Sequence, residues 1–335
     1  MLRSIVVLGI ALIIAAFSAT AMAGPTIKLG HVDPAEWQSS KKGAAGVIFK
    51  NIVEGETDIS VELFPAKALG DENSLVQQVQ EGTTHMAIVS GAMSTVCKTA
   101  DVLNIPYTFA SPTIAWDVLD GQFGKDLAEH CLQKTGLRTL AYGETGFRNF
   151  TNNVREIKTP ADMKGLKFRV QPIPLYVEMV KGLGGEPTPI AWSELPNALA
   201  TGVVDGQENP VGVIYNNKLH KLQKYLVLDG HVYGTDFIVI NDEFFQSLPA
   251  KDQAIIKKAA RIAGTMGRAI QQFNTAEGVT KVAAEGMKVY SPTGAELAQF
   301  KKLAQPAVKN WLTGELGDDA VWIENLDAAV TEASK

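Results

Sequence analysis

The segment GLKFRVQPIPLY, residues 165–176, places an arginine in the middle of an expected β-strand. Leu166, Phe168 and Val170 share one parity and form the apolar face of that strand. Arg169 belongs to the other face, and the prolines that follow cannot continue a central ladder. The arginine therefore lies near the carboxyl end of its strand, where open α/β sheets present their ligand crevices. A guanidinium there can bind an anion, whereas a surface strand could also carry it without function.

Other polar residues are expected at loops and strand ends. Arg148 follows a glycine-containing turn in GETGFRNF, and Trp192 immediately precedes Ser193, an expected helix N-cap. The segment VDGQENP predicts a tight turn that contains Glu208 and Asn209. Each of these residues also has an ordinary explanation: a surface arginine, a packed tryptophan, or turn chemistry.

Motifs for catalysis, metals and cofactors are absent from the sequence. None of the five histidines lies four residues from another, and the HExxH, GxSxG, GxxxxGK[ST] and strand-linked GxGxxG patterns do not occur. We therefore expect no catalytic residue, no metal ligand and no cofactor. Cys97 and Cys131 lie outside any CxxC pair, so a disulfide and two free thiols both remain open.

The start of the chain resembles an export signal. An apolar run from Ile5 to Phe17 leads to the A-x-A motif at residues 21–23, which predicts a signal peptide over residues 1–23 and a periplasmic protein.

The remaining roughly 310 residues exceed what one hydrophobic core usually supports, so two lobes are expected. With 31 Lys+Arg against 36 Asp+Glu, the net charge of −5 disfavours binding to nucleic acid or to an anionic membrane surface.

The order of expected elements predicts two α/β units that face one another across a cleft. The first unit is a strand–helix–strand–helix–strand succession, typical of a mostly parallel sheet with helices on both sides. Expected strands are 26–32, 58–65, 85–91, 137–144, 165–172, 184–190, two within 226–241, and 287–292. Expected helices are 37–53, 71–82, 113–134, 175–183, 193–201, one very long helix within 249–286, and two at the C-terminus.

Four motifs occur in order at close spacing: GFRNFTNN, ADMKGLKFRVQ, GGEPTPIAWSEL and ATGVVDGQENP. Together they resemble the DctP-type solute receptors of tripartite ATP-independent periplasmic (TRAP) transporters. LFPAKALGDENSLVQQVQEG, in the first unit, agrees with this family as well. The resemblance covers essentially the whole exported chain. An ABC-type binding protein is the structural alternative, which the four motifs disfavour.

The resemblance implies an α/β, two-lobed periplasmic binding protein, or Venus flytrap, with a long helix spanning both lobes. The two lobes would close around one organic anion. The boundaries expected from it are a signal peptide over 1–23, lobe I over 24–145 plus 234–273, and lobe II over 146–233 plus 274–335.

The resemblance also implies which residues bind the ligand. Arg169 would pair with the ligand carboxylate, and Arg148, Asn209 and Trp192 would complete the lobe II side. In lobe I, two positions that commonly line the cavity of this family correspond to Glu72 and Ser90.

Three further residues are candidates for the cleft. His31 and Trp37 follow the first strand, in a segment that differs freely across this family, and Asp236 lies in GTDF. Acids near a carboxylate-binding arginine indicate a ligand that donates hydrogen bonds, such as a sugar acid, a hydroxy acid or an amino-acid-like compound. An aromatic acid that packs between Trp37 and Trp192 is a further possible ligand.

The expected partners are a small carboxylate ligand and the small and large membrane subunits of a TRAP permease, with no nucleic acid and with the receptor as a monomer. A periplasmic enzyme or a ligand sensor on the same clamshell is the alternative function.

Overall fold

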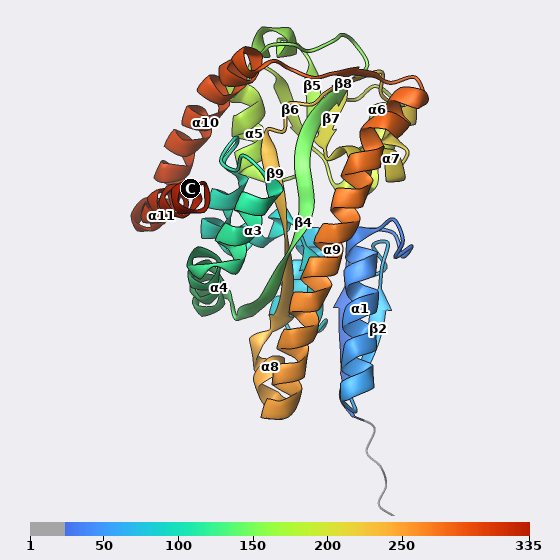
Figure 1. The fold of residues 1–335 in the computed structure, drawn as a ribbon, viewed down its shortest axis with the longest axis vertical. Coiled ribbons are helices and arrows are strands. Elements are labelled where there is room, and N and C mark those ends of the chain that lie inside the picture. The colour runs from blue at the N-terminus through green and yellow to red at the C-terminus, as the bar shows by residue number, and fades with distance from the viewer. Residues whose placement is uncertain (1–23) are drawn as a thin grey trace, which may run out of the picture.

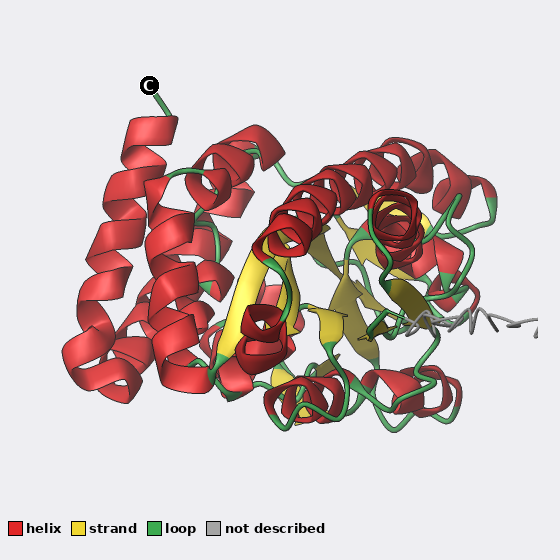
Figure 2. Cartoon of the chain, turned by 90° about the horizontal axis from the view of Figure 1, so that it is seen from below, coloured by secondary structure: helices red, strands yellow, loops and turns green. Residues whose placement is uncertain are grey.

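The structure, a computed structural model, describes residues 24–335, so the predicted signal peptide lies outside the described residues. Two α/β lobes lie one above the other in Figure 1, and Figure 2 shows helices on both sides of the strands. No helix in this part of the chain is long and apolar enough to cross a membrane.

The strands form one ten-stranded sheet that passes through both lobes, with β2-β1-β3-β9-β4-β7-β5-β6 as its main order. In chain order the strands are β1 (Thr26–Gly30), β2 (Ser60–Phe64), β3 (Met86–Val89), β4 (Leu137–Asn152), β5 (Lys167–Val170), β6 (Glu186–Pro189), β7 (Gly206–Asn209), β8 (Tyr225–Val227), β9 (Val232–Asn241) and β10 (Lys288–Tyr290). Strands β1–β3 pair in parallel, as do β5–β7, whereas β4 and β9 run antiparallel to their neighbours. Each lobe thus has a parallel sheet, and the antiparallel pair connects the two.

Helices cover both lobes. They are α1 (Lys41–Glu56), α2 (Glu72–Gln80), α3 (Pro112–Asp120), α4 (Gln122–Thr135), α5 (Pro174–Gly182), α6 (Leu195–Ala200), α7 (Val211–Asn216), α8 (Asp242–Ser247), α9 (Ala250–Ala284), α10 (Gly294–Leu316) and α11 (Val321–Ala333). Short 3₁₀ helices include η1 (Gly91–Thr95), η2 (Lys98–Asn104) and η4 (Trp192–Glu194).

The long helix predicted from the sequence is confirmed as α9, which packs against α1 in lobe I and α7 in lobe II. Two of its three buried glycines, Gly264 and Gly267, explain how α9 approaches β4 and α1 so closely. A Cβ on Gly264 would lie 2.7 Å from the carbonyl oxygen of Tyr142, and one on Gly267 would lie 3.3 Å from that of Lys41. Close packing therefore offsets the helix propensity that these glycines lack.

Four sequence predictions are wrong in detail. Ser193, predicted to cap a helix, lies inside η4, and Glu194 precedes the first residue of α6. The single helix over residues 113–134 is two helices, because Gly121 has extended backbone and ends α3 before α4 begins. The segment around Asn209, predicted as a tight turn, is the buried strand β7. Arg148 does not follow a turn, because β4 is longer than expected and contains it.

The C-terminal helices contact both lobes. Helix α10 packs on α5, whereas α11 packs against α3 and α4. The assignment of residues 274–335 to lobe II stays a prediction.

The question about the two cysteines is answered by the structure. Cys97 and Cys131 are both buried and form a disulfide, with their Cα atoms 5.5 Å apart. The bond ties the start of η2 to α4 across 34 residues of sequence.

Replacing both cysteines by alanine should lower the free energy of unfolding by roughly 2–4 kcal/mol, because the cross-link restricts the unfolded chain. Urea denaturation of the ligand-free variant and wild type measures the difference. Reduced wild-type protein is the control that separates the cross-link from lost packing. Equal stability of oxidised and reduced wild type would contradict this prediction.

Candidate functional site

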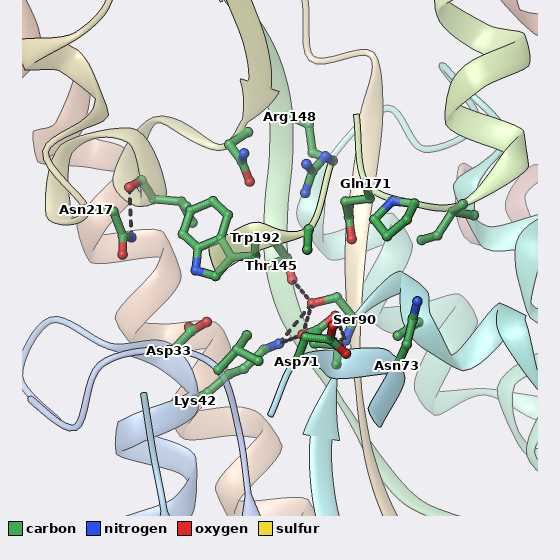
Figure 3. A pocket seen from close by; sticks show the side chains of 18 of the residues that line it. Asp33, Lys42, Asp71, Asn73, Ser90, Thr145, Arg148, Gln171, Trp192 and Asn217 are labelled. Carbon is green, nitrogen blue, oxygen red and sulfur yellow. Dashed lines mark hydrogen bonds and ion pairs between the residues drawn. The ribbon is translucent and has the colours of Figure 1, made fainter. Parts of the chain in front are cut away.

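A cleft between the lobes brings polar side chains from distant parts of the sequence together (Figure 3). Lobe II supplies residues from the ends of β5 and β7, from β4, and from the start of η4. Lobe I supplies residues from the start of α1, the start of α2 and the segment after β3. Strand ends and helix starts therefore meet here, as expected for an α/β ligand site.

Arg169 is the central side chain of the lobe II wall. It is only 1% exposed, and its Nε donates a hydrogen bond of 2.8 Å to the carbonyl oxygen of Ile190. No carboxylate oxygen of the described residues lies within 4.0 Å of its guanidinium. Burial lowers the pKa of Arg169 to about 10, so the group is still a cation at neutral pH. A buried positive charge without a carboxylate partner thus lines the cleft.

Arg148 is also buried, but it has a carboxylate partner within the protein. Its Nη2 donates to Oε1 of Glu208 at 2.7 Å and to the Glu208 carbonyl oxygen at 2.8 Å, while its Nε donates to Oε2. Burial would lower the pKa of Arg148, but Glu208 raises it above the usual value. The same ion pair helps hold the pKa of Glu208 at about 2, although burial would raise it. Glu208, predicted only as a turn residue, is therefore a structural counter-ion.

The imidazole of His231 contacts the carboxylate of this ion pair. Its two ring nitrogens lie 3.2 Å from Oε2 of Glu208 and 2.9 Å from Oδ2 of Asp229. Burial would lower the pKa of His231, but Asp229 and Glu208 together raise it. The imidazole thus fixes the orientation of the carboxylate that holds Arg148.

Trp192 and Asn209 complete the lobe II wall. The guanidinium carbon of Arg169 lies 5.9 Å from the centre of the Trp192 ring, within the range of a cation–π contact. Asn209 donates from Nδ2 to Oε1 of Gln207 at 2.6 Å. The ring shields one side of the arginine, and the Gln207 contact fixes the amide.

The lobe I wall is a network around Lys42, the second residue of α1. Its Nζ donates to Glu72 and to the hydroxyl of Ser90 at 2.9 Å, and lies 3.5 Å from Oδ1 of Asp236. The Ser90 backbone N–H donates to Glu72 at 3.2 Å. Asp236 also accepts a hydrogen bond from the Thr145 hydroxyl at 2.6 Å.

Helix starts place these charges. Ser40 caps α1 by accepting from the N–H of Gly43, which puts Lys41 and Lys42 in the first turn. Asp71 caps α2 in the same way, and Glu72 follows it. Lys41 donates to Oδ2 of Asp33 at 2.8 Å.

Six of the nine predicted site residues line the cleft, and three do not. The lining residues are Arg169, Arg148, Asn209, Trp192, Glu72 and Ser90. Asp236 lies behind Ser90 and Lys42, His31 is buried, and Trp37 is 53% exposed on the loop before α1. A ligand contact by any of the nine stays a prediction.

Sequence reasoning missed Lys41 and Lys42. A signal was present, because two lysines in the first turn of a helix oppose the helix dipole and need a local reason. Lys41 pairs with Asp33 nearby in sequence, but Lys42 pairs with Glu72, 30 residues further along, and both lysines face Asp236 on β9, which no local pattern connects to them. In the described residues no group of three or more His, Cys, Asp and Glu side chains is arranged to hold a metal ion.

Comparisons with known proteins agree with this architecture. Residues 30–314 match the profile of DctP, described as bacterial extracellular solute-binding protein, family 7. A solute-binding protein from Verminephrobacter eiseniae is 38% identical over 274 residues, which cover 81% of each chain.

Two solved structures are similar over nearly their whole length. A TRAP periplasmic solute-binding protein from Polaromonas, bound to D-erythronate, is 32% identical with a TM-score of 0.84, covering 91% of this chain and 99% of that chain. The sugar acid binding protein DctPAm from Advenella mimigardefordensis, in complex with galactonate, is 29% identical with a TM-score of 0.86, covering 92% and 99%.

Removing the counter-ion of Arg148 should destabilise the ligand-free protein. Glu208→Ala leaves a buried, unpaired cation and should lower the free energy of unfolding by roughly 3–5 kcal/mol in urea denaturation. Glu186→Ala, at an exposed position of β6, is the matched control and should change it by less than about 0.5 kcal/mol. Similar effects of the two substitutions would show that the buried pair contributes nothing special.

Proposed function

Because the chain belongs to the DctP family of TRAP transporter solute receptors, we propose that its interlobe cleft binds a small organic acid through the guanidinium of Arg169. The chain is a periplasmic solute-binding protein, and members of this family are receptors and not enzymes. The observation that carries the proposal is the contrast between two buried arginines. Arg148 has its carboxylate within the protein, whereas Arg169 has none among the described residues.

A ligand carboxylate would supply the missing partner. The planar guanidinium can return two charge-assisted hydrogen bonds in matched geometry to a carboxylate that has lost its water. Trp192 would keep solvent from one side of this pair, and Arg148 and Asn209 would add polar contacts. A lysine would substitute poorly for Arg169 because an ammonium lacks the fork.

Closure needs contacts from both lobes, because a ligand shifts a conformational equilibrium only through differential affinity for the two states. We assign the lobe I contacts to Glu72 and Ser90, with Asp236 supporting Ser90, and leave His31 and Trp37 as more distant candidates. The proposed lobes are 24–145 plus 234–273 and 146–233 plus 274–335. The closed, monomeric receptor would deliver its acid to the membrane subunits.

Arg169→Ala should weaken binding of the acid by roughly 30- to 5000-fold, the range for removing one member of a desolvated charge pair. The acid is first identified by a thermal-shift screen of refolded, ligand-stripped protein, and affinity is then measured by calorimetry. The melting temperature of the ligand-free variant should stay nearly unchanged, because removing a buried charge that lacks a carboxylate partner offsets the lost hydrogen bond to Ile190 and the lost packing. Arg261→Ala, at an exposed position of α9, is the control. Affinity retained within about threefold would refute the assignment of Arg169.

Trp192→Ala should weaken binding less than Arg169→Ala does. A cation–π contact contributes about 0.5–2 kcal/mol, which corresponds to about 2- to 30-fold in affinity. The same calorimetric titration measures both variants. The reverse order of effects would make the aromatic ring the main anchor.

A further inference from the structure

The lobe I wall of the cleft contains two lysines, which at first suggests a site for a second anionic group. We infer instead that this wall rejects a second carboxylate and selects an acid whose chain carries hydroxyl groups. The inference rests on the proposed function and names the ligand class: hydroxylated monocarboxylates are bound in preference to the dicarboxylates of the same chain. The wall is defined by Lys41, Lys42, Asp33, Glu72 and Asp236.

Lys42 is surrounded by protein groups and already donates two hydrogen bonds, to Glu72 and to Ser90. An ammonium group has three N–H donors, and three protein groups surround this one: Glu72, the Ser90 hydroxyl at 2.9 Å and Asp236 at 3.5 Å. The side chain is only 1% exposed. In Figure 3 Lys42 points toward Ser90 on the lower wall, facing Arg148, Gln171 and Trp192 on the upper wall. The positive charge of Lys42 is thus balanced by carboxylates of lobe I.

Lys41 is neutralised in the same way. It is buried, donates to Oδ2 of Asp33 at 2.8 Å and lies 3.7 Å from Oδ2 of Asp236. Asp236 thus faces both lysines, one with each carboxylate oxygen. Each ammonium group thus lies beside two carboxylates of lobe I, so a ligand carboxylate would have to compete with internal ion pairs for either lysine.

The balance of charge on this wall is negative. Two ammonium groups face three carboxylates, which leaves about one negative charge in the network. Burial would raise the pKa of Asp33, but Lys41 and Lys42 lower it to about 2, so this carboxylate is ionised. Burial would likewise lower the pKa of Lys42, but Asp236 and Glu72 raise it above its usual value.

The wall therefore offers acceptors and not positive charge. Asp33 and Glu72 line the cleft, and a carboxylate accepts hydrogen bonds but cannot donate them. A ligand hydroxyl can donate to either, and the amides of Asn73 and Gln171 in the same cleft can serve as donor or acceptor. A second carboxylate on the ligand would lie next to the negatively charged Asp33 and Glu72, and bringing like charges together in a binding site lowers affinity. On the lobe II side, Glu208 neutralises Arg148, so Arg169 is left as the cation that can pair with a ligand carboxylate. The cleft therefore matches a ligand with one carboxylate.

Matched pairs of acids test the inference. D-Erythronate and meso-tartrate differ only in a terminal CH₂OH against a carboxylate, as do D-galactonate and galactarate. Butanoate and hexanoate have the same chain lengths without hydroxyl groups. In calorimetric titrations of the refolded, ligand-stripped protein, at least one hydroxylated monocarboxylate should bind. Its dicarboxylate should bind at least about 30-fold more weakly, because like charges meet, and the unhydroxylated acid should show no measurable binding.

Glu72→Gln tests the cause of the selectivity. It keeps the shape of the side chain and removes one negative charge, so the preference for the monocarboxylate should fall by at least about tenfold. Glu81→Gln, at the exposed end of α2, is the matched control and should leave the preference unchanged. Asp33→Asn serves as a second variant where Glu72→Gln fails to fold.

The outcomes separate this inference from the proposed function. The inference is overturned if a dicarboxylate binds as tightly as its monocarboxylate, if none of the hydroxylated acids binds, or if Glu72→Gln and Asp33→Asn leave the preference unchanged. Arg169→Ala is titrated with the same acids. If a dicarboxylate binds wild type as tightly as its monocarboxylate does, and Arg169→Ala no longer binds it, the selectivity of the lobe I wall is refuted. The same result supports Arg169 as the residue that binds the carboxylate. If Arg169→Ala still binds a monocarboxylate, the role of Arg169 in the proposed function is refuted. The preference of wild type for monocarboxylates over dicarboxylates still tests the selectivity of the lobe I wall.

Discussion

A buried guanidinium with no carboxylate partner among residues 24–335 is the constraint around which this cleft is organised. Arg169 is almost wholly removed from bulk water, and its Nε is satisfied by the carbonyl oxygen of Ile190. Leaving a buried charge unpaired is expensive, so such an arrangement persists only when a partner arrives from outside or the surroundings compensate for it. Arg148 lies in the same wall and is neutralised by Glu208, so that only one of the two cations remains for a ligand.

The fold holds the two walls in register through a few elements that belong to both lobes. Strand β4 pairs with β9 along most of its length and then with β7, which carries Glu208 and Asn209. Helix α9 packs on β4 and contacts both α1 of lobe I and α7 of lobe II. The close approach at Gly264 and Gly267 sets the position of β4 and of the start of α1, where the two lysines lie. Close backbone packing against α9 thus helps determine where the charges of the lobe I wall are placed.

Local patterns were sufficient to predict much of this frame. The alternation around Arg169 placed it at a strand end, and the absence of internal proline indicated the long helix. Pairings between distant segments were not predictable from local patterns. Glu208 was read as a turn residue because QEN followed by proline is typical of a turn, yet antiparallel pairing with β4 makes it a buried strand. The roles of Lys42 and Asp236 depend on segments that only the folded chain brings together.

The single unpaired charge also couples binding to closure. An open cleft lets water solvate Arg169, whereas a closed and empty cleft would remove that water and give nothing in return. A neutral or fully paired wall would carry no such penalty, and the lobes could then close without cargo. In the proposed function, a carboxylate ligand would remove the penalty and its hydroxyl groups would reach acceptors on the other lobe, so the contacts that favour closure would exist only when both walls are engaged. On this proposal the closed shape would report an occupied cleft, which is the property a receptor needs if its membrane partner is to recognise only the loaded form.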